Sequence, residues 1–291
     1  MIQSLTIGGW ELRRVLAARS TPLLASGILA LFAALVAFKH QWLLPLNDRG
    51  HVLMWLYGST SLGEVYQVVA VVITFFGLLV PFLAADGVAR EHRQRTHELV
   101  MTTAAPVWAL VAGRFLAVLA QTLVAALLVL AGTLAAQLLV HALQPEFPAP
   151  DVRSLLSLWA VLVLPAGVLL AGASFLAGTL VPRRSTVVKI GVVLVWIAIA
   201  AVVDLAQGLS WYPYWSPAGN ALLGVASTAF VQAYVAIAGT TAAGDPATTL
   251  GAQQTAVDLR PWVLPHLGLV ALGLMGAAAA AAGFRRSRGL V

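Results

Sequence analysis

Long apolar blocks recur along this chain of 291 residues and constrain its fold more than any other feature. A membrane helix needs about 20 apolar residues to cross the hydrocarbon core of a bilayer, and several of the blocks reach that length. Only 10% of the residues are charged, whereas an ordinary soluble domain has about 25%. The sequence therefore predicts an all-α integral membrane protein rather than a soluble domain.

Six spanning helices are predicted from the limits of these blocks. They cover residues 22–39, 66–85, 110–140, 155–181, 187–207 and 262–283. Together they form one transmembrane domain over 22–291, with a cytoplasmic loop at 86–109 and an outer loop at 208–261. The stretch 217–239 in the outer loop is apolar but contains several polar residues, so we predict a re-entrant or interfacial helix there.

An amphipathic helix is predicted in residues 1–21, ahead of the first span. Its apolar residues recur at helical spacing with basic residues between them, and they are Trp10, Leu12, Val15 and Leu16. A helix of this kind lies in the membrane interface with its basic side chains toward the lipid headgroups. Membrane lipids are therefore expected partners of this segment.

The basic residues set the orientation of the predicted spans. With the N-terminus inside, 13 of the 17 Lys and Arg residues lie in cytoplasmic segments. Such an excess marks the cytoplasmic side of a membrane protein. We therefore expect both termini in the cytoplasm and the protein in a bacterial cytoplasmic (inner) membrane. Because the basic residues lie at helix ends rather than on one face, nucleic acid is not an expected partner.

The most informative segment is the polar run 86–106, between the second and third predicted spans. It has no glycine or proline between Val88 and Ala105. Glu91 precedes Arg95 by four residues, which is the favourable order for a helical ion pair. A short polar helix along the inner surface is one interpretation. A solvated loop held at the membrane by its positive charge is the other.

The same run resembles the signature of ABC-2 type exporter permeases. The resemblance is carried by Asp86, Ala89-Arg90-Glu91, Arg95-Thr96, Glu98-Leu99, Thr103 and Pro106, followed by Val111-Ala112-Gly113-Arg114-Phe115-Leu116. The chain departs from the family in having Arg114 where lysine is commoner and Val100 where leucine is frequent. The six predicted spans and the amphipathic helix before them are similar to that family's architecture.

The resemblance implies a role for the loop at 86–109. In such permeases this loop docks as a coupling helix into a separate ATPase subunit and transmits its closure to the membrane helices. The implied partner-binding residues are Arg90, Glu91, Arg95, Thr96, Glu98 and Leu99, with Pro106 and Gly113 shaping the return into the third span and Glu11, Arg13 and Arg14 as further candidates. The resemblance also implies a second permease copy, expected as a homodimer, and ATPase subunits that bind the ATP and Mg²⁺.

Motifs for catalysis by the chain itself are absent from its sequence. A phosphate-binding loop needs a lysine after a glycine, but the only two lysines, Lys39 and Lys189, follow Phe38 and Val188. The chain has no cysteine and no motif of a zinc protease or a serine hydrolase. We therefore expect neither enzyme activity nor a cofactor or metal ion in this chain.

Few polar side chains within the spans could line a substrate pathway. The candidates are Gln67, Thr74, Gln121, Thr122, Thr133, Gln137, Ser174 and Asp204. Each of them can instead hydrogen-bond a neighbouring helix. No carboxylate is visible near the midplane of the predicted spans, which disfavours ion-coupled transport.

The sequence favours the permease subunit of an ATP-driven exporter. The alternative is a non-transporting membrane scaffold or assembly factor that binds a cytoplasmic partner through the loop at 86–109. An integral membrane enzyme is a third interpretation. It is disfavoured because the sequence offers no group of polar residues that would come together as an active site.

Overall fold

The computed structural model describes residues 2–18, 20–43, 62–85, 106–143, 149–202, 212–238 and 257–287. Every regular element within these ranges is a helix, which confirms the all-α prediction. In chain order the elements are α1 (Ile2–Leu16), α2 (Ser20–Leu43), α4 (Leu62–Ala84), α7 (Val107–Leu143), α8 (Val152–Leu158), η3 (Trp159–Val163), α9 (Leu164–Leu180), η4 (Pro182–Arg184), α10 (Ser185–Val202), α11 (Tyr212–Trp215), α12 (Asn220–Ala238) and α14 (Arg260–Ser287).

Within the described ranges, three helical segments are long and apolar enough to cross a membrane. They are α7, the continuous run 152–180 that joins α8, η3 and α9, and α14 as far as Phe284. A fourth span arises if α1 and α2, which are bent by 78°, are taken together as one broken span. The predicted spans 22–39, 66–85 and 187–207 correspond to α2, α4 and α10, which are apolar helices of 24, 23 and 18 residues. Helices thus lie at all six predicted positions, and the count of six membrane spans stays a prediction.

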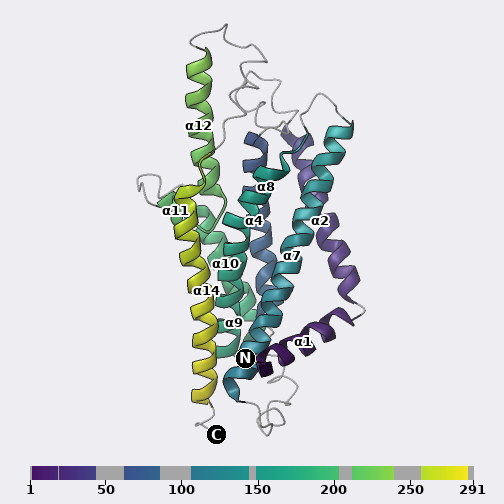
Figure 1. Ribbon diagram of the computed structural model, residues 1–291, viewed down its shortest axis with the longest axis vertical. Helices are drawn as coiled ribbons and strands as arrows, with labels where there is room; N and C mark the ends of the chain where they lie inside the picture. Colours follow the sequence, from purple (N-terminus) through teal and green to yellow (C-terminus); the bar gives the residue numbers. More distant parts are fainter. Residues whose placement is uncertain are drawn as a thin grey trace.

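The longest helix, α7, lies at the centre of the bundle (Figure 1). It has 37 residues and packs against α1, α2, α4, α9 and α14. Small residues let its neighbours approach closely: a Cβ atom built at Gly132 would lie 2.7 Å from the Leu29 carbonyl oxygen of α2. On α9, Phe175 packs edge-on against Phe115 of α7, with the ring centroids 5.5 Å apart. Through these contacts α7 packs against five of the other described helices.

The closest helix pair consists of α9 and α14, which lie side by side. Glycines line their contact, because a Cβ atom built at Gly172 would lie 2.5 Å from the carbonyl carbon of Gly273. In the same contact, a Cβ atom at Gly276 would lie 3.1 Å from the Gly172 carbonyl oxygen. The absence of side chains at these positions brings the two backbones together and adds packing that lipid cannot replace.

A π turn interrupts the span formed by residues 152–180. The backbone N–H of Leu164 donates to the carbonyl oxygen of Trp159, five residues earlier, and Pro165 follows directly. A proline inside an α-helix removes a hydrogen-bond donor and clashes with the carbonyl group four residues before it. The wider π turn accommodates Pro165 without breaking the span.

Two buried tryptophans tie neighbouring helices together. The indole N–H of Trp159 donates to the Ala126 carbonyl oxygen of α7 over 3.1 Å. The indole N–H of Trp196 on α10 donates to the Thr74 carbonyl oxygen of α4 over 3.0 Å. Because both side chains are almost fully buried, the apolar rings also fill space between the helices they connect.

The first turn of α1, the start of α7 and the last turn of α14 lie at the same end of the molecule (Figure 1). Near the opposite end, α12 begins where Gly219 packs against Ala70 of α4. Among the described side chains of α12, those of Ala221, Leu222 and Ala226 are buried, and the helix then extends past the beginning of α14 (Figure 1). This helix occupies the segment for which a re-entrant or interfacial helix is predicted, and that assignment stays a prediction.

Candidate functional site

The predicted coupling loop leads directly into α7. Its predicted contact residues Arg90, Glu91, Arg95, Thr96, Glu98 and Leu99 lie outside the described residues. Pro106, the last residue before α7, is half-buried, and its carbonyl oxygen accepts hydrogen bonds from the backbone N–H groups of Ala109 and Leu110 over 2.9 and 3.3 Å. Pro106 thus caps the first turn of α7, and its part in shaping the return from the loop stays a prediction.

Gly113, two turns into α7, is the point where α1 crosses this helix. A Cβ atom at Gly113 would lie 2.7 Å from the Ser4 carbonyl oxygen and 2.8 Å from the Ile7 Cβ atom. On the α1 side, a Cβ atom at Gly8 would lie 2.9 Å from the Gly113 carbonyl oxygen. The sequence singled out Gly113 for shaping the loop, and the structure adds that its missing side chain makes room for α1.

The polar residues of α1 form a charged group near this crossing. A carboxylate oxygen of Glu11 lies 2.7 Å from a guanidinium nitrogen of Arg14, one helical turn further on. Both Arg13 and Arg14 are exposed, whereas Glu11 is half-buried. The three sequence-predicted residues are therefore on one helix that is in contact with the beginning of α7.

Further basic residues lie at the ends of the neighbouring helices. Arg183 and Arg184 are exposed in η4, directly after α9. The end of α4 lies beside the end of α9, because a Cβ atom at Gly178 would lie 3.0 Å from the carbonyl carbon of Ala85. The ammonium group of Lys189 on α10 lies 5.9 Å from the centre of the Phe82 ring of α4. Among the described residues, basic side chains thus lie at the end of the bundle at which α7 begins.

Three of the predicted pathway residues are hydrogen-bonded to their own helices. The hydroxyl groups of Thr74, Thr122 and Thr133 each donate to the carbonyl oxygen four residues earlier on their own helix, over 2.8–3.0 Å. These bonds stay within each helix, whereas the alternative predicted from the sequence is a hydrogen bond to a neighbouring helix. The side chain of Gln67 and the whole of Asp204 lie outside the described residues.

Two other candidates, Gln137 and Ser174, are buried without a hydrogen bond. The side chains are 1% and 0% exposed, and within the described part of the chain their polar atoms have no partner. A buried polar group without a partner costs free energy, so such groups call for a second arrangement, an ordered water or a ligand. Gln137 and Ser174 are therefore the pathway candidates that the packing leaves open.

A cavity of about 490 Å³ with mixed polar and apolar walls lies near the end of the bundle opposite the loop. Its walls come from α4, α8, η3, the chain before α14 and the start of α14, and their polar residues are Tyr66, Arg153, Ser154, Ser157, Asp258 and Arg260. The hydroxyl oxygen of Tyr66 accepts a hydrogen bond from the Val257 backbone N–H over 2.8 Å, which joins two of these walls. The sequence prediction did not find this cavity. The signal for it in the sequence is that Arg153 and Arg260 each lie just ahead of a predicted span, on the same predicted side of the membrane.

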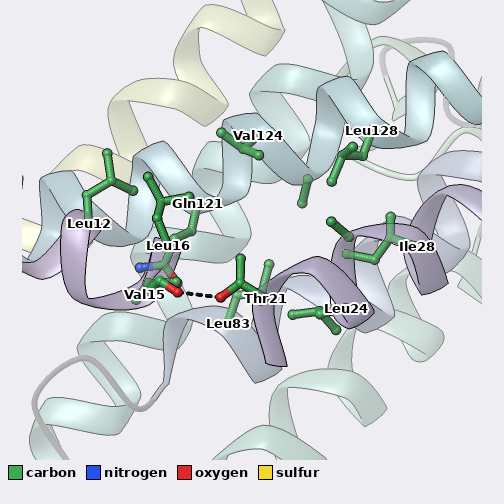
Figure 2. A pocket seen from close by; sticks show the side chains of 12 residues that line it. Leu12, Val15, Leu16, Thr21, Leu24, Ile28, Leu83, Gln121, Val124 and Leu128 are labelled. Atoms are coloured by element: carbon green, nitrogen blue, oxygen red, sulfur yellow. Dashed lines mark hydrogen bonds between the residues drawn. The ribbon is translucent and has the colours of Figure 1, made fainter. Parts of the chain in front are cut away.

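An apolar crevice of about 80 Å³ lies between α1, α2, α4 and α7 (Figure 2). Gln121 lines it, and among the described pathway candidates it alone lines either cavity. This residue is therefore placed at the α1–α2 corner rather than with the other candidates.

Taken together, the apolar helices define a multi-pass α-helical membrane protein with an amphipathic helix laid across the base of its central span. The chain belongs to the ABC-2 family transporter proteins, because the model of that family matches residues 45–285. The match covers the loop at 86–109 and the five spans predicted around and after it, and it confirms the resemblance to ABC-2 type permeases. It identifies the chain as the permease component of an ABC transporter. No curated protein matches this sequence.

Proposed function

We propose that this permease works in an ATP-driven exporter of a bacterial cytoplasmic membrane. In this proposal the chain forms a homodimer, both termini are cytoplasmic, and a separate ATPase subunit binds the ATP and Mg²⁺. The ATPase contacts the loop at 86–109 and, beside it, Glu11, Arg13 and Arg14. Substrate passes between helices whose buried polar groups, Gln137 and Ser174 among them, pair with the substrate or with each other when the bundle opens.

The observation that carries the proposal is the connection of the loop to α7. This helix starts at Val107, directly after Pro106, and continues without a break for 37 residues. A displacement of the loop therefore acts on a helix that contacts α1 at Gly113 and α2 at Gly132. Because packed helices move as units, α7 is suited to carry the closure of an ATPase into the bundle.

Charge supports the proposed orientation. Arg13, Arg14, Arg183 and Arg184 are exposed at the ends of elements on the loop side of the bundle. Basic residues flanking membrane helices favour the cytoplasm. The same positive end would face an ATPase, whose binding surface would then be expected to carry acidic residues.

The test is co-purification of the tagged full-length chain from its native membrane, with the partners identified by mass spectrometry. Wild type is compared with Glu91→Arg, which reverses a charge in the loop, and with Asp258→Arg, which makes the same change at an exposed position near the opposite end. We expect an ATPase with a phosphate-binding loop to accompany wild type and Asp258→Arg, and to be lost with Glu91→Arg.

Other outcomes would reject specific parts of the proposal. If no ATPase accompanies wild type under gentle conditions with an ATP analogue present, the exporter proposal fails and the scaffold alternative gains. If the ATPase accompanies Glu91→Arg as well, the loop is not the main contact. ATP-dependent release of a cargo from inside-out vesicles rather than its uptake would exclude export as the direction.

A further inference from the structure

The corner between α1 and α2 stands away from α7. The two helices meet at 78°, and the hydroxyl group of Thr21 on α2 donates a hydrogen bond to the Val15 carbonyl oxygen of α1. Close glycine contacts hold the arms of this corner against α7, with α1 at Gly113 and α2 at Gly132. These glycines are roughly 28 Å apart along the helix axis at 1.5 Å per residue. Between these two contacts the corner leaves a gap over α7. We call the two helices from the Gly113 contact to the Gly132 contact the α1–α2 arch.

The apolar crevice of about 80 Å³ lies under this arch (Figure 2). Its lining residues are Leu12, Val15 and Leu16 of α1, Thr21, Leu24, Ala25 and Ile28 of α2, Leu83 of α4, and Gln121, Val124, Ala125 and Leu128 of α7. The rim is open, because Leu16, Leu24 and Val124 are 57%, 49% and 47% exposed, whereas Ile28 and Ala125 at the floor are buried. The crevice thus leads from an apolar outer surface into the bundle.

A positive charge lies beside the opening. Arg13 does not line the crevice itself, but it is exposed and lies one helical turn before the rim residue Leu16 of α1. The neighbouring Arg14 is paired with Glu11 at 2.7 Å, so the two largely cancel. Among the described residues Arg13 has no acidic partner, and it supplies the net charge of this stretch of α1. A long arginine side chain reaches from an apolar surface to the headgroup level of a membrane.

A crevice with apolar walls and a cation near its rim fits an amphipathic anion, a molecule with a hydrocarbon chain and a negatively charged headgroup. A dry cavity of about 150 Å³ holds one benzene molecule, so a crevice half that size takes part of a single acyl chain rather than a globular ligand. In a membrane protein the molecules present at this depth are phospholipids, and an interfacial basic helix attracts the anionic ones.

We propose that the crevice under the α1–α2 arch binds an acyl chain of one anionic phospholipid whose phosphate contacts Arg13. The bound chain fills the gap between the two glycine contacts and holds the corner at its angle. This site shares Arg13 with the ATPase contacts proposed for α1 but uses no residue of the loop at 86–109. Lipid binding by the chain alone does not depend on ATP binding or on the direction of transport.

Titration of the full-length chain in detergent with phosphatidylglycerol, followed by native mass spectrometry, tests the proposal. Phosphatidylcholine of the same chain length serves as the comparison lipid. Val124→Trp places a large side chain at the rim of the crevice, and Leu127→Trp makes the same change at an exposed α7 position that does not line it. Arg13→Gln removes the charge at the rim, and Arg183→Gln removes an exposed charge elsewhere on the same end.

We expect wild type, Leu127→Trp and Arg183→Gln to retain one phosphatidylglycerol per chain in preference to phosphatidylcholine. Val124→Trp loses this lipid, and Arg13→Gln binds it about five-fold more weakly, the ratio for one basic residue near an anionic surface. Equal retention of both lipids by wild type would overturn the proposal. So would a loss with Leu127→Trp equal to that with Val124→Trp, or unchanged phosphatidylglycerol binding by Arg13→Gln.

Discussion

Replacing Gly172 by alanine tests whether the close contact of α9 and α14 holds the bundle together. The new Cβ atom would lie 2.5 Å from the carbonyl carbon and 2.7 Å from the Cα atom of Gly273. These are backbone atoms, so no side chain can rotate out of the way. Ordinary contact begins at 3.4 Å, and the Gly273 carbonyl oxygen lies closer to the new atom than the carbonyl carbon does, so the two helices must separate by at least roughly 0.9 Å.

The cost follows from this separation. A gap of about 0.5–1 Å forfeits a quarter to a half of the dispersion energy of each contact across it. Overpacking of this kind costs about 1–3 kcal/mol, and the upper end applies because the obstacle is backbone. Alanine is favoured over glycine within a helix by about 1 kcal/mol, which offsets part of the loss. The net expectation is a decrease of about 2 kcal/mol in the free energy of unfolding.

The assay is reversible unfolding of the purified chain in mixed micelles, with increasing denaturing detergent and helix content as the signal. Gly191→Ala on α10 is the matched control, because a Cβ atom there would meet no atom within 4 Å. The control should leave stability unchanged or raise it by up to about 1 kcal/mol. If Gly172→Ala proves as stable as Gly191→Ala, the glycine contact does not limit the approach of the helices.

Two further substitutions probe side-chain hydrogen bonds with the same assay. Trp196→Phe removes the indole N–H that donates to the Thr74 carbonyl oxygen over 3.0 Å, and should cost about 1–2 kcal/mol, whereas Trp10→Phe, at a side chain that is 74% exposed, should cost nothing measurable. Asp151 accepts hydrogen bonds at the start of α8, and these bonds, above all the one from the Ser154 hydroxyl group, hold the pKa of its carboxyl group below the ordinary 3.8. A lowered pKa means that the stabilisation is complete above the ordinary value and is lost as the pH falls through the lower one. Asp151→Ala should therefore destabilise the protein by about 1 kcal/mol at neutral pH and have no effect once the carboxyl group of wild type is protonated; an effect that is the same at both pH values would contradict this role.

The positions of the helices were predictable because each depends on a local pattern. The third predicted span, 110–140, lies within α7. The fourth, 155–181, agrees with the run 152–180 to within three residues at each end. Both are long apolar segments, and length and apolarity are properties of the segment itself. The amphipathic helix was also predictable from the spacing of its apolar residues, although α1 begins earlier than that pattern, at Ile2.

The pairing of helices was not predictable in the same way. Gly113 drew notice through a family motif, but its contact with Ser4 and Ile7 depends on where α1 crosses α7. Similarly, Gln121 and Thr122 are adjacent in the sequence, yet Gln121 lines the crevice and Thr122 is buried with its hydroxyl group bonded to its own helix. Which face of a mostly apolar helix meets a neighbour is decided by packing, and the apolar pattern carries little information about it.

The length of α7 has a consequence for how force crosses the membrane. At 1.5 Å per residue its 37 residues extend about 55 Å, while a bilayer with its headgroups is about 40–45 Å thick. Even with the tilt of about 20° that is usual for such helices, both ends of α7 reach the water on either side. A single rigid rod then joins the two aqueous phases, so that any rotation imposed at the Pro106 end is felt at the far surface without passing through a hinge.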